Sequence, residues 1–228
     1  MKSVDQITVR LRFAGETPRP APYHLRGAIA AQFPDDPLFH QHAANGNGLM
    51  YRLPRIQYRW DHEGPILVGL EEGARRLLEV AWPGMELCLG KLRVTVRDAE
   101  CAFQRFDVRM VPHLLRYRLM APWLPFSQEN YARYQTLGPA AQALERDRLA
   151  RGAILIGLRE LGVKLNEHLF VAVEAVAAER CSYKGIDLLG FWGRVLANTA
   201  LPPGFAFGRA VSHGYGWIVP DTDEESKR

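Results

Sequence analysis

The fold is decided first by residues 4–13, which read VDQITVRLRF. Apolar and polar side chains alternate along this stretch, and such a period of two indicates a strand with one buried face. The positions expected to be buried are Ile7, Val9, Leu11 and Phe13. Residues 23–33 follow with apolar side chains at helical spacing, and Pro34 ends that pattern. The chain therefore begins with a strand and a helix.

The segments that follow extend this beginning to a complete domain. Residues 49–60, which contain Pro54, and residues 65–70 are predicted as two strands joined by the turn DHEG. Residues 71–81 start with two glutamates, which suit the first turn of a short helix. Residues 85–103 then give one or two further strands. The order strand–helix–strand–strand–helix–strand is that of the ferredoxin-like fold.

The second half predicts a similar set of elements. A strand runs into the Pro/Trp-rich segment APWLPF, and Ser127 then stands as the N-cap of a helix. The longest helical pattern covers residues 140–165, and residues 168–201 alternate like two or three strands. We therefore expect an α+β protein of two tandem ferredoxin-like (RRM-like) domains with antiparallel sheets. The expected boundaries are 1–108 and 109–220, followed by a disordered tail at 221–228.

Composition narrows the class of protein without fixing its activity. The chain has 228 residues, of which 47% are hydrophobic and 24% are charged, as expected of a globular protein, and its net charge is +4. No window approaches the ~20 apolar residues of a membrane helix, and no signal peptide is evident at the start. The three cysteines, Cys88, Cys101 and Cys181, are widely spaced among apolar residues. We interpret them as buried free thiols of a cytoplasmic protein.

Arginine outnumbers lysine strongly among the basic residues. Only five of the 29 basic residues are lysine, and removing the tail DTDEESKR raises the net charge from +4 to +6. The planar guanidinium suits phosphate and stacks on bases, so this bias favours nucleic acid as a partner. A genome that encodes arginine in place of lysine throughout would give the same bias, and composition leaves both explanations open.

Four glycines fall within thirteen residues near the end of the chain, at Gly204, Gly208, Gly214 and Gly216. Arg209, Ser212, His213 and several aromatic residues stand between them. The spacing matches neither a Walker loop nor a dinucleotide-binding fingerprint. Glycine lets backbone amides approach phosphates, and arginine and aromatic neighbours add charge and stacking for RNA. The alternative is a tight hairpin before the last strand.

The segment LFHQHAANG (38–46) places His40 and His42 two residues apart. RNA cleavage by an internal 2′-hydroxyl needs a base and an acid, and imidazole, with an ordinary pKa near ~6.5, fills either role. A zinc site is the second interpretation, but it needs three or four ligands. Further ligands would have to come from Asp35, Asp36, His24 or His62. Two solvated loop histidines are the third interpretation.

Negative charge that builds on the phosphorane oxygens during such a reaction needs a nearby positive group to stabilise it. The candidates on the following strand are Tyr51, Arg55 and Arg59. Arg55 and Arg59 alternate with apolar residues, so one face of that strand is predicted to be polar and cationic. Lys184 either contacts a phosphate or caps a turn. Trp123 is interpreted as a core or inter-domain anchor and not as a base-stacking platform.

Five segments in this order resemble a known family: LRGAIAAQFPDDPLFHQHAANGNGLMYRLPRIQYRW, LVGLEEGARRLLEV, APWLPFSQENYARY, YKGIDLLGFWGRV and GFAFGRAVSHGYG. The chain resembles the CRISPR-associated endoribonucleases that cut precursor CRISPR RNA, the Cas6 type of the RAMP superfamily. The likeness extends over residues 4–219. It implies two ferredoxin-like domains with RNA bound across a positive face.

The resemblance also implies a reaction. Family members cut within each repeat without a metal or cofactor, and they leave a 2′,3′-cyclic phosphate and a 5′-hydroxyl. Their catalytic histidine often lies near the end of the first helix, where His40 and His42 stand, and Tyr51 is a weaker third candidate. The expected partners are CRISPR repeat RNA and no membrane, with effector-complex subunits and a homodimer as further candidates. A rival interpretation is a non-catalytic RNA-binding subunit of an effector complex.

Overall fold

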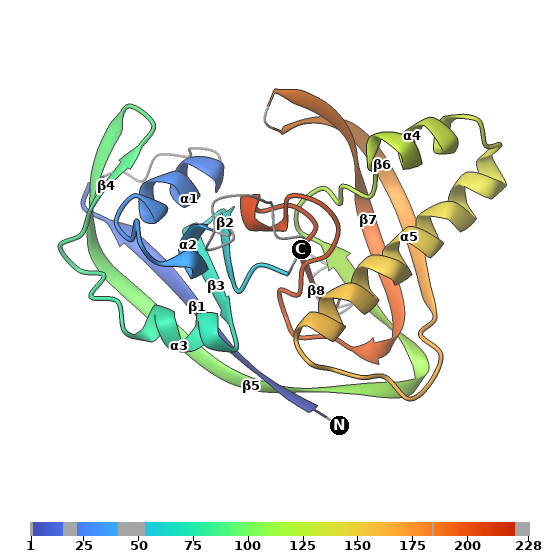
Figure 1. Cartoon of the computed structure of the whole chain (residues 1–228), viewed down its shortest axis with the longest axis horizontal. Helices are drawn as coiled ribbons and strands as arrows, with labels where there is room; N and C mark the ends of the chain where they lie inside the picture. The colour runs from blue at the N-terminus through green and yellow to red at the C-terminus, as the bar shows by residue number, and fades with distance from the viewer. Residues whose placement is uncertain (1, 16–21, 41–52, 184, 222–228) are drawn as a thin grey trace. The chain divides into compact units, whose positions relative to one another are not determined.

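The computed structural model describes residues 2–15, 22–40, 53–183 and 185–221. The chain is an α+β protein, as the sequence predicted (Figure 1). Its described residues form two compact units. The N-terminal unit comprises 3–106 together with 212–214, and the C-terminal unit comprises the remainder. No helix in the described ranges is both long and apolar enough to cross a lipid bilayer.

The N-terminal unit has the predicted ferredoxin-like order of elements. They are β1 (Lys2–Phe13), α1 (Pro22–Ala30), α2 (Pro37–His40), β2 (Ile56–Asp61), β3 (Gly64–Leu70), α3 (Glu72–Leu78), β4 (Glu86–Leu89) and the first part of β5 (Leu92–Leu119). The strands lie in the order β2-β3-β1-β5, with β4 paired to β5 as an added hairpin. This arrangement confirms the predicted order strand–helix–strand–strand–helix–strand.

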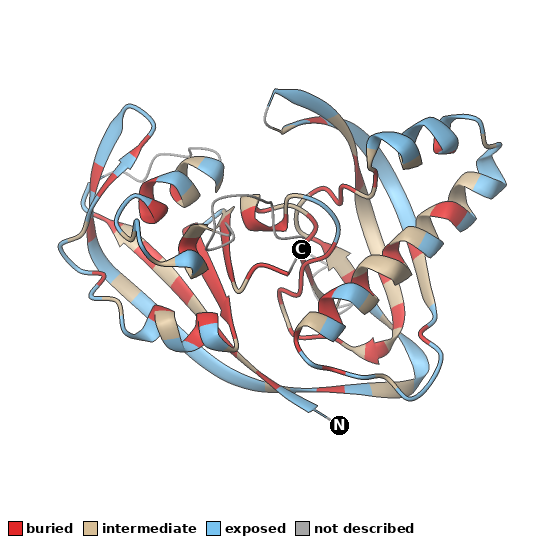
Figure 2. Ribbon diagram, in the orientation of Figure 1, coloured by how far each residue is buried: buried red, intermediate tan, exposed pale blue. Residues whose placement is uncertain are grey.

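The core of this unit follows from the alternation along β1. Its odd-numbered residues from Ile7 to Phe13 are buried, as predicted, and α1 and α3 contribute Leu25 and Leu77 to the same cluster (Figure 2). Register fixes this face, because Thr8 is opposite Val68 and a shift of one residue would expose the whole set. Each buried leucine or isoleucine contributes about 2 kcal/mol to the free energy of unfolding.

The C-terminal unit repeats the same strand order with one element missing. Its elements are the second part of β5, α4 (Gln128–Gln135), α5 (Pro139–Glu160), β6 (Val171–Tyr183), β7 (Ile186–Ala200) and β8 (Ile218–Pro220). Arg118 of β5 is opposite both Arg194 and Val219, so β8 and β7 flank β5 and the order is β8-β5-β7-β6. The glycine-rich segment stands where a second helix would be.

Two predictions about single residues are confirmed in this unit. The Ser127 hydroxyl accepts a hydrogen bond from the Asn130 amide at 3.2 Å, as an N-cap of α4 does. Trp123 is fully buried, and its ring lies 5.5 Å from that of Phe207. It is therefore a core anchor of the C-terminal unit.

The cysteines differ from the prediction in part. Cys181 is buried, and burial raises the pKa of its thiol to about 11. Cys88 and Cys101, however, are exposed free thiols, so their predicted burial is wrong. The reason at Cys88 is strand geometry: Leu87 and Leu89 take the buried face of β4, and the residue between them must point the other way.

A buried carboxylate joins α4 to α5. Glu145 is 6% exposed and accepts hydrogen bonds from Arg148 at 2.7 Å and from Arg133 at 2.5 Å. The bond from Arg148 is the largest influence on its pKa, which falls to about 2. Since the two arginines are half exposed, solvent weakens their contribution.

We expect Glu145→Gln to lower the free energy of unfolding by about 2 kcal/mol at neutral pH, because two guanidinium groups lose their anion. The pKa of the folded carboxyl lies below its ordinary 4.5, so its contribution is present above that pH and is lost as pH falls toward about 2. Urea denaturation at neutral and acidic pH measures the difference in the free energy of unfolding between the parent protein and Glu145→Gln. The exposed Glu167→Gln is the control, and an equal difference at both pH values would contradict the assignment.

Candidate active site

His40 is the last residue of the short helix α2. The residues that begin this helix, Asp36 and Pro37, determine where it starts. The Asp36 carboxylate accepts a hydrogen bond from the Leu38 amide at 3.0 Å, as an N-cap does. Pro37 follows as the first helical residue, a position where its missing N–H costs nothing. A helix of only four residues is not stable by itself, so other contacts must hold it.

Aromatic and cationic side chains hold the body of α2 in place. The Phe33 and Phe39 rings stack at 4.3 Å with an interplanar angle of 16°. The Arg76 guanidinium lies over both rings, 5.2 and 5.5 Å from their centroids. Arg76 also donates to Asp36 at 2.7 Å, so one side chain of α3 fixes both the cap and the stack.

The carbonyl groups at the end of α2 are held by two further side chains. The Tyr58 hydroxyl donates to the Phe39 carbonyl oxygen at 3.3 Å, and Arg26 donates to the His40 carbonyl oxygen at 2.7 Å. Burial raises the pKa of Tyr58, which keeps its hydroxyl protonated and able to donate. The cation of Arg26 at a helix C-terminus is also favourable to the helix dipole.

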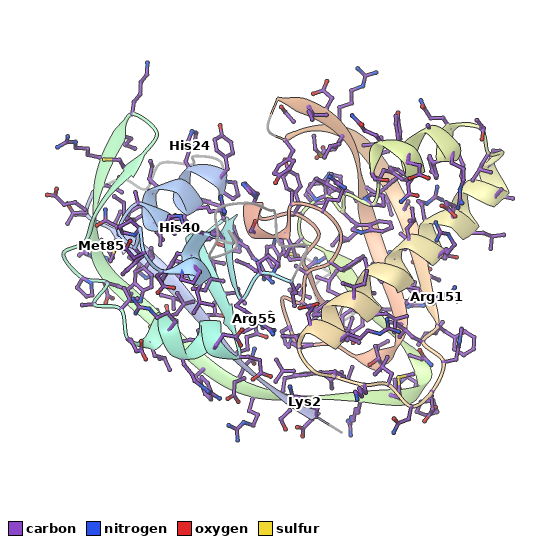
Figure 3. All side chains as sticks on the ribbon, in the orientation of Figure 1. Lys2, His24, His40, Arg55, Met85 and Arg151 are labelled. Atoms are coloured by element: carbon purple, nitrogen blue, oxygen red, sulfur yellow. The ribbon has the colours of Figure 1, made fainter. Side chains whose placement is uncertain are left out.

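The His40 ring is oriented by its own hydrogen bond. Nε2 lies 2.8 Å from the Phe33 carbonyl oxygen. A carbonyl can only accept, so Nε2 carries the proton, and Nδ1 is the ring nitrogen that can take one up. Figure 3 shows His40 beside α1 and α2 within the N-terminal unit. A histidine fixed in this way is prepared for acid–base chemistry at one defined atom.

Three predicted site residues lie outside the described part of the chain. They are His42, Tyr51 and Lys184. The pairing of His40 with His42 and the role of Tyr51 therefore stay predictions. Within the described residues, no group of three or more His, Cys, Asp or Glu side chains is placed to hold a metal ion.

The two arginines expected beside the histidines are engaged elsewhere. Arg55 donates to Glu72 at 2.7 Å. Arg59 is 2% exposed and donates to the Gln57 side-chain oxygen at 2.6 Å, and burial lowers its pKa to about 9. The polar face predicted for β2 exists, but Gln57 and Arg59 on it are buried in this structure.

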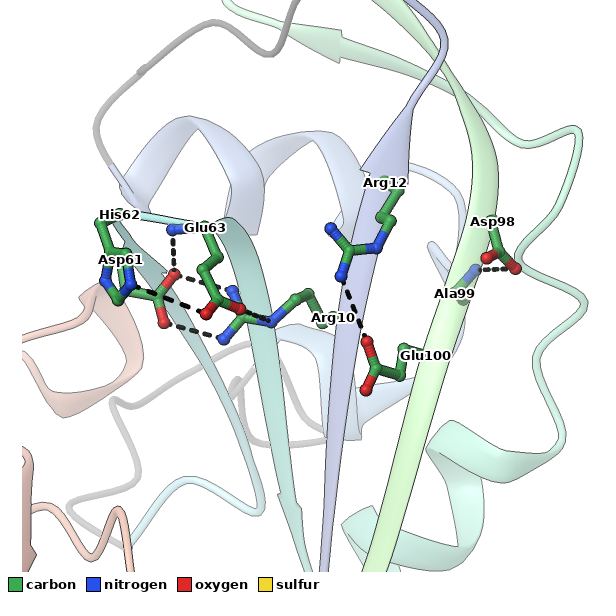
Figure 4. A network of polar contacts seen from close by, with 8 residues as sticks. All are labelled: Arg10, Arg12, Asp61, His62, Glu63, Asp98, Ala99 and Glu100. Carbon is green, nitrogen blue, oxygen red and sulfur yellow. Dashed lines mark hydrogen bonds and ion pairs between the residues drawn. The ribbon is translucent and has the colours of Figure 1, made fainter.

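Neighbouring arginines of the same sheet are neutralised by carboxylates. Arg10 binds Asp61 through two bonds of 2.7 and 2.9 Å and also lies 3.2 Å from Glu63 (Figure 4). Burial alone would raise the pKa of Asp61, but its bonds from Arg10 and the Glu63 amide lower it overall. Arg12 pairs with Glu100 at 3.3 Å. These cations of the inner strand β1 are paired with carboxylates and are not free for an anionic ligand.

The glycine-rich segment forms a hairpin-like loop in which all four glycines have positive φ. The amide of Gly204 donates to Ile218, that of Arg209 to Leu124 and that of Gly216 to Pro122. These amides are used within the protein, so a phosphate would have to be bound by other groups. Arg209, whose side chain is exposed, is one such group.

The tip of this loop, Ser212–Gly214, belongs to the same unit as His40. A Cβ added to Gly214 would lie 3.0 Å from Pro22 and 3.1 Å from the Tyr58 carbonyl oxygen. The Ser212 hydroxyl lies 3.1 Å from Nδ1 of His213. The structure therefore brings His40, Ser212, His213 and Gly214 into one unit, whereas Gly204, Gly208, Arg209 and Gly216 lie in the other.

Sequence reasoning did not single out Arg26, Asp36, Tyr58 or Arg76 as supports of the site. Asp36 had a readable signal, since an Asp followed by Pro commonly begins a helix. Arg26 is 14 residues from His40, and Arg76 is 40 residues from Asp36. Nothing in the local pattern indicates such contacts.

We expect Gly216→Ala to destabilise the protein by about 3 kcal/mol or more, because φ is +64° and the new Cβ would lie 2.2 Å from the Phe207 carbonyl oxygen. The matched control is Gly152→Ala within α5, where no atom lies within 4 Å of the added Cβ. That change should stabilise by about 0.5–1 kcal/mol. Thermal unfolding measures the midpoints of both variants. Equal midpoints for Gly216→Ala and Gly152→Ala would refute the proposed backbone constraint at Gly216.

Models of two domains from one protein family match the two halves of the chain. The model of the Cas6b N-terminal domain matches residues 4–107, and that of the Cas6b C-terminal domain matches residues 109–220. An uncharacterized protein of Methanocaldococcus jannaschii is 28% identical over 127 residues, which cover 56% of this chain and 85% of that protein.

Solved structures share the fold. A crystal structure of Cas6b superposes with a TM-score of 0.85 at 21% identity, covering 96% of this chain and 100% of that one. A CRISPR RNA processing endoribonuclease Cas6b gives 0.75 at 20% identity, again covering 96% and 100%. A Cas6 product complex gives 0.60 at 17% identity with the same coverage.

Proposed function

The chain belongs to the Cas6b family, and on that premise we propose that it is an endoribonuclease that cuts CRISPR repeat RNA without a metal ion. The observation that supports this proposal is the anchored His40, whose Nε2 is bound to the Phe33 carbonyl oxygen. Proton transfer to or from the RNA would then use the other ring nitrogen, Nδ1. The solved relative described as a CRISPR RNA processing endoribonuclease Cas6b supports the substrate class.

The proposed reaction is a transesterification within the RNA. The 2′-hydroxyl loses its proton to a base and attacks the adjacent phosphorus, while the bond to the 5′-oxygen breaks and that oxygen receives a proton from an acid. The products are a 2′,3′-cyclic phosphate and a 5′-hydroxyl. His40 takes one of the two proton-transfer roles, His42 takes the other, and Tyr51 is a weaker third participant.

The RNA is proposed to be held by the glycine-rich loop and by basic residues. Arg209 and His213 are the loop side chains suited to phosphate or base contacts, with Lys184 as a further candidate. Arg55 and Arg59 would have to leave Glu72 and Gln57 to take part. Effector-complex subunits and a second copy of the chain remain proposed partners.

The rival proposal is a non-catalytic RNA-binding subunit with the same fold. It needs the loop and the basic residues but not His40 or His42. A metal-dependent hydrolase is a more distant rival, which chelation would inactivate. The non-catalytic subunit would bind the RNA without cutting it, and the metal-dependent hydrolase would cut it only when its metal ion is present.

We expect repeat RNA to be cut in excess EDTA, because no metal takes part. A single 2′-deoxy sugar at the cut site should abolish cutting while leaving binding intact, since the attacking group is gone. Denaturing gels of end-labelled RNA measure the cutting of both RNAs, and filter binding measures the affinity for the 2′-deoxy RNA. Cutting of the 2′-deoxy RNA at that position would refute the mechanism, and binding without any cutting by the parent protein would favour the rival subunit.

We expect His40→Ala to slow cleavage by about 10²- to 10⁴-fold, because it removes one proton-transfer group. The parent rate should follow a bell-shaped pH profile between pH about 5 and 9, since one group must be deprotonated and the other protonated. Single-turnover rates across this range measure both effects. His62→Ala, an exposed histidine outside the site, is the matched control. A flat profile for the parent protein would contradict two-histidine catalysis.

A further inference from the structure

Phe170 is a large apolar side chain that the C-terminal unit leaves exposed. It stands directly before β6, and 59% of its surface is accessible to solvent. Leu169 beside it is buried, so the chain alternates here and both His168 and Phe170 lie on the outer side. A scattered exposed apolar residue needs no explanation by itself, but this one belongs to a cluster of defined contacts.

Asn198 of β7 fixes the backbone on both sides of Leu169. Its side-chain oxygen accepts a hydrogen bond from the Phe170 amide at 2.8 Å, and its side-chain nitrogen donates to the His168 carbonyl oxygen at 3.0 Å. The Asn198 amide donates to the Phe170 carbonyl oxygen at 3.3 Å. One residue thus holds the segment through three hydrogen bonds, so Phe170 is presented from a fixed backbone and little conformational entropy is lost when its ring binds a ligand.

His168 and Arg151 complete the cluster. The His168 and Phe170 rings meet edge to face, with centroids 4.7 Å apart and an interplanar angle of 68°. Nε2 of His168 lies 3.4 Å from Nη1 of Arg151 on α5 (Figure 3). A guanidinium can only donate, so Nε2 accepts and Nδ1 of His168 carries the proton. Arg148, one turn earlier, is paired with Glu145, whereas the partner of Arg151 among the described residues is this neutral ring.

We propose that Phe170, His168 and Arg151 form a subsite for one nucleotide of single-stranded RNA. An unpaired base stacks on the exposed Phe170 ring, and the adjacent phosphate binds the remaining N–H donors of Arg151. Nδ1 of His168 supplies a further donor to the same nucleotide. This inference rests on the proposed RNA substrate and deepens it. Because the subsite contains none of the residues proposed for proton transfer, its contribution is to the affinity for the RNA.

RNA suits this cluster better than the apolar surface of a protein partner does. Two of the three side chains are polar, and an aromatic ring together with a cation is the combination that binds single-stranded nucleic acid. Tyr131, the other exposed aromatic side chain in the described part of this unit, packs against Phe126 with ring centroids 5.6 Å apart. Leu144 and Ile156, which are exposed on α5, are aliphatic and offer no π-face to a base.

Filter binding of repeat RNA with a 2′-deoxy sugar at the cut site tests the subsite, because that RNA is bound without being cut. Phe170→Ala should raise Kd by about 10-fold, since the stacking surface is lost, and Phe170→Trp should restore about the parent Kd. Arg151→Gln should raise Kd and reduce the slope of log Kd against log salt by about 0.7, since one phosphate contact is lost. Leu144→Ala, which removes an exposed aliphatic side chain from the same unit, is the matched control and should keep the parent Kd.

Photocrosslinking locates the contact directly. Repeat RNA with 4-thiouridine in place of uridine should form an adduct with the tryptic peptide 165–180 of the parent protein, which contains His168 and Phe170. Phe170→Ala should lose this adduct, and Leu144→Ala should retain it.

The outcomes distinguish this inference from the proposed function. A parent Kd for both Phe170→Ala and Arg151→Gln would overturn the subsite and leave the endoribonuclease intact. An equal loss of affinity in Phe170→Ala and Phe170→Trp would show that stacking is not the cause, which also overturns it. Failure of the parent protein to bind repeat RNA would remove the proposed function itself, and with it the subsite. Thermal unfolding of each variant confirms that the affinities refer to folded protein.

Discussion

The hydrogen bond from the Tyr58 hydroxyl to the Phe39 carbonyl oxygen links the sheet of the N-terminal unit to the helix that ends at His40. Tyr58 is buried, and its strand position is fixed by pairing with Leu67. Its backbone carbonyl lies under Gly214 at the tip of the glycine-rich loop. One core residue therefore contacts both the helix that carries the candidate catalytic histidine and the loop tip. A short helix such as α2 depends on supports of this kind, because it has too few internal hydrogen bonds to persist alone.

The two units use the same strand order but differ in what joins their third and fourth strands. In the N-terminal unit, α3 makes this connection, and it also carries Arg76 to the cap of α2. In the C-terminal unit, the glycine-rich segment replaces the helix. Without a helix, the segment must satisfy its amides by bonds to distant carbonyls, and that path requires positive φ at all four glycines. The glycines are thus explained by backbone geometry first, and any contact with RNA is an additional use.

Arginine content by itself is a weak guide to ligand binding in this protein. Arg10, Arg76, Arg133, Arg148 and Arg194 all form ion pairs with carboxylates. A guanidinium that already has its anion stabilises the fold and offers little to a phosphate. Arg26 and Arg59 differ from these five, because Arg26 donates to the His40 carbonyl oxygen and Arg59 donates to the Gln57 side-chain oxygen. The number of arginines does not distinguish those paired with carboxylates from those with neutral partners, whereas the contacts in the structure do.

The sequence by itself determined the elements and their order, because alternation on β1, helical spacing on α5 and the Ser127 cap are local properties of the chain. The helical spacing before Pro34 predicted α1, whereas the separate short helix α2 that ends at His40 was not predicted. Only the tertiary structure decided which nitrogen of His40 is bound, that Arg59 is buried, and that Cys88 is exposed. These outcomes depend on contacts such as Arg26 with His40 and Arg76 with Asp36, which join distant parts of the chain. Local periodicity cannot specify such contacts, because they arise only when packing brings separate elements together.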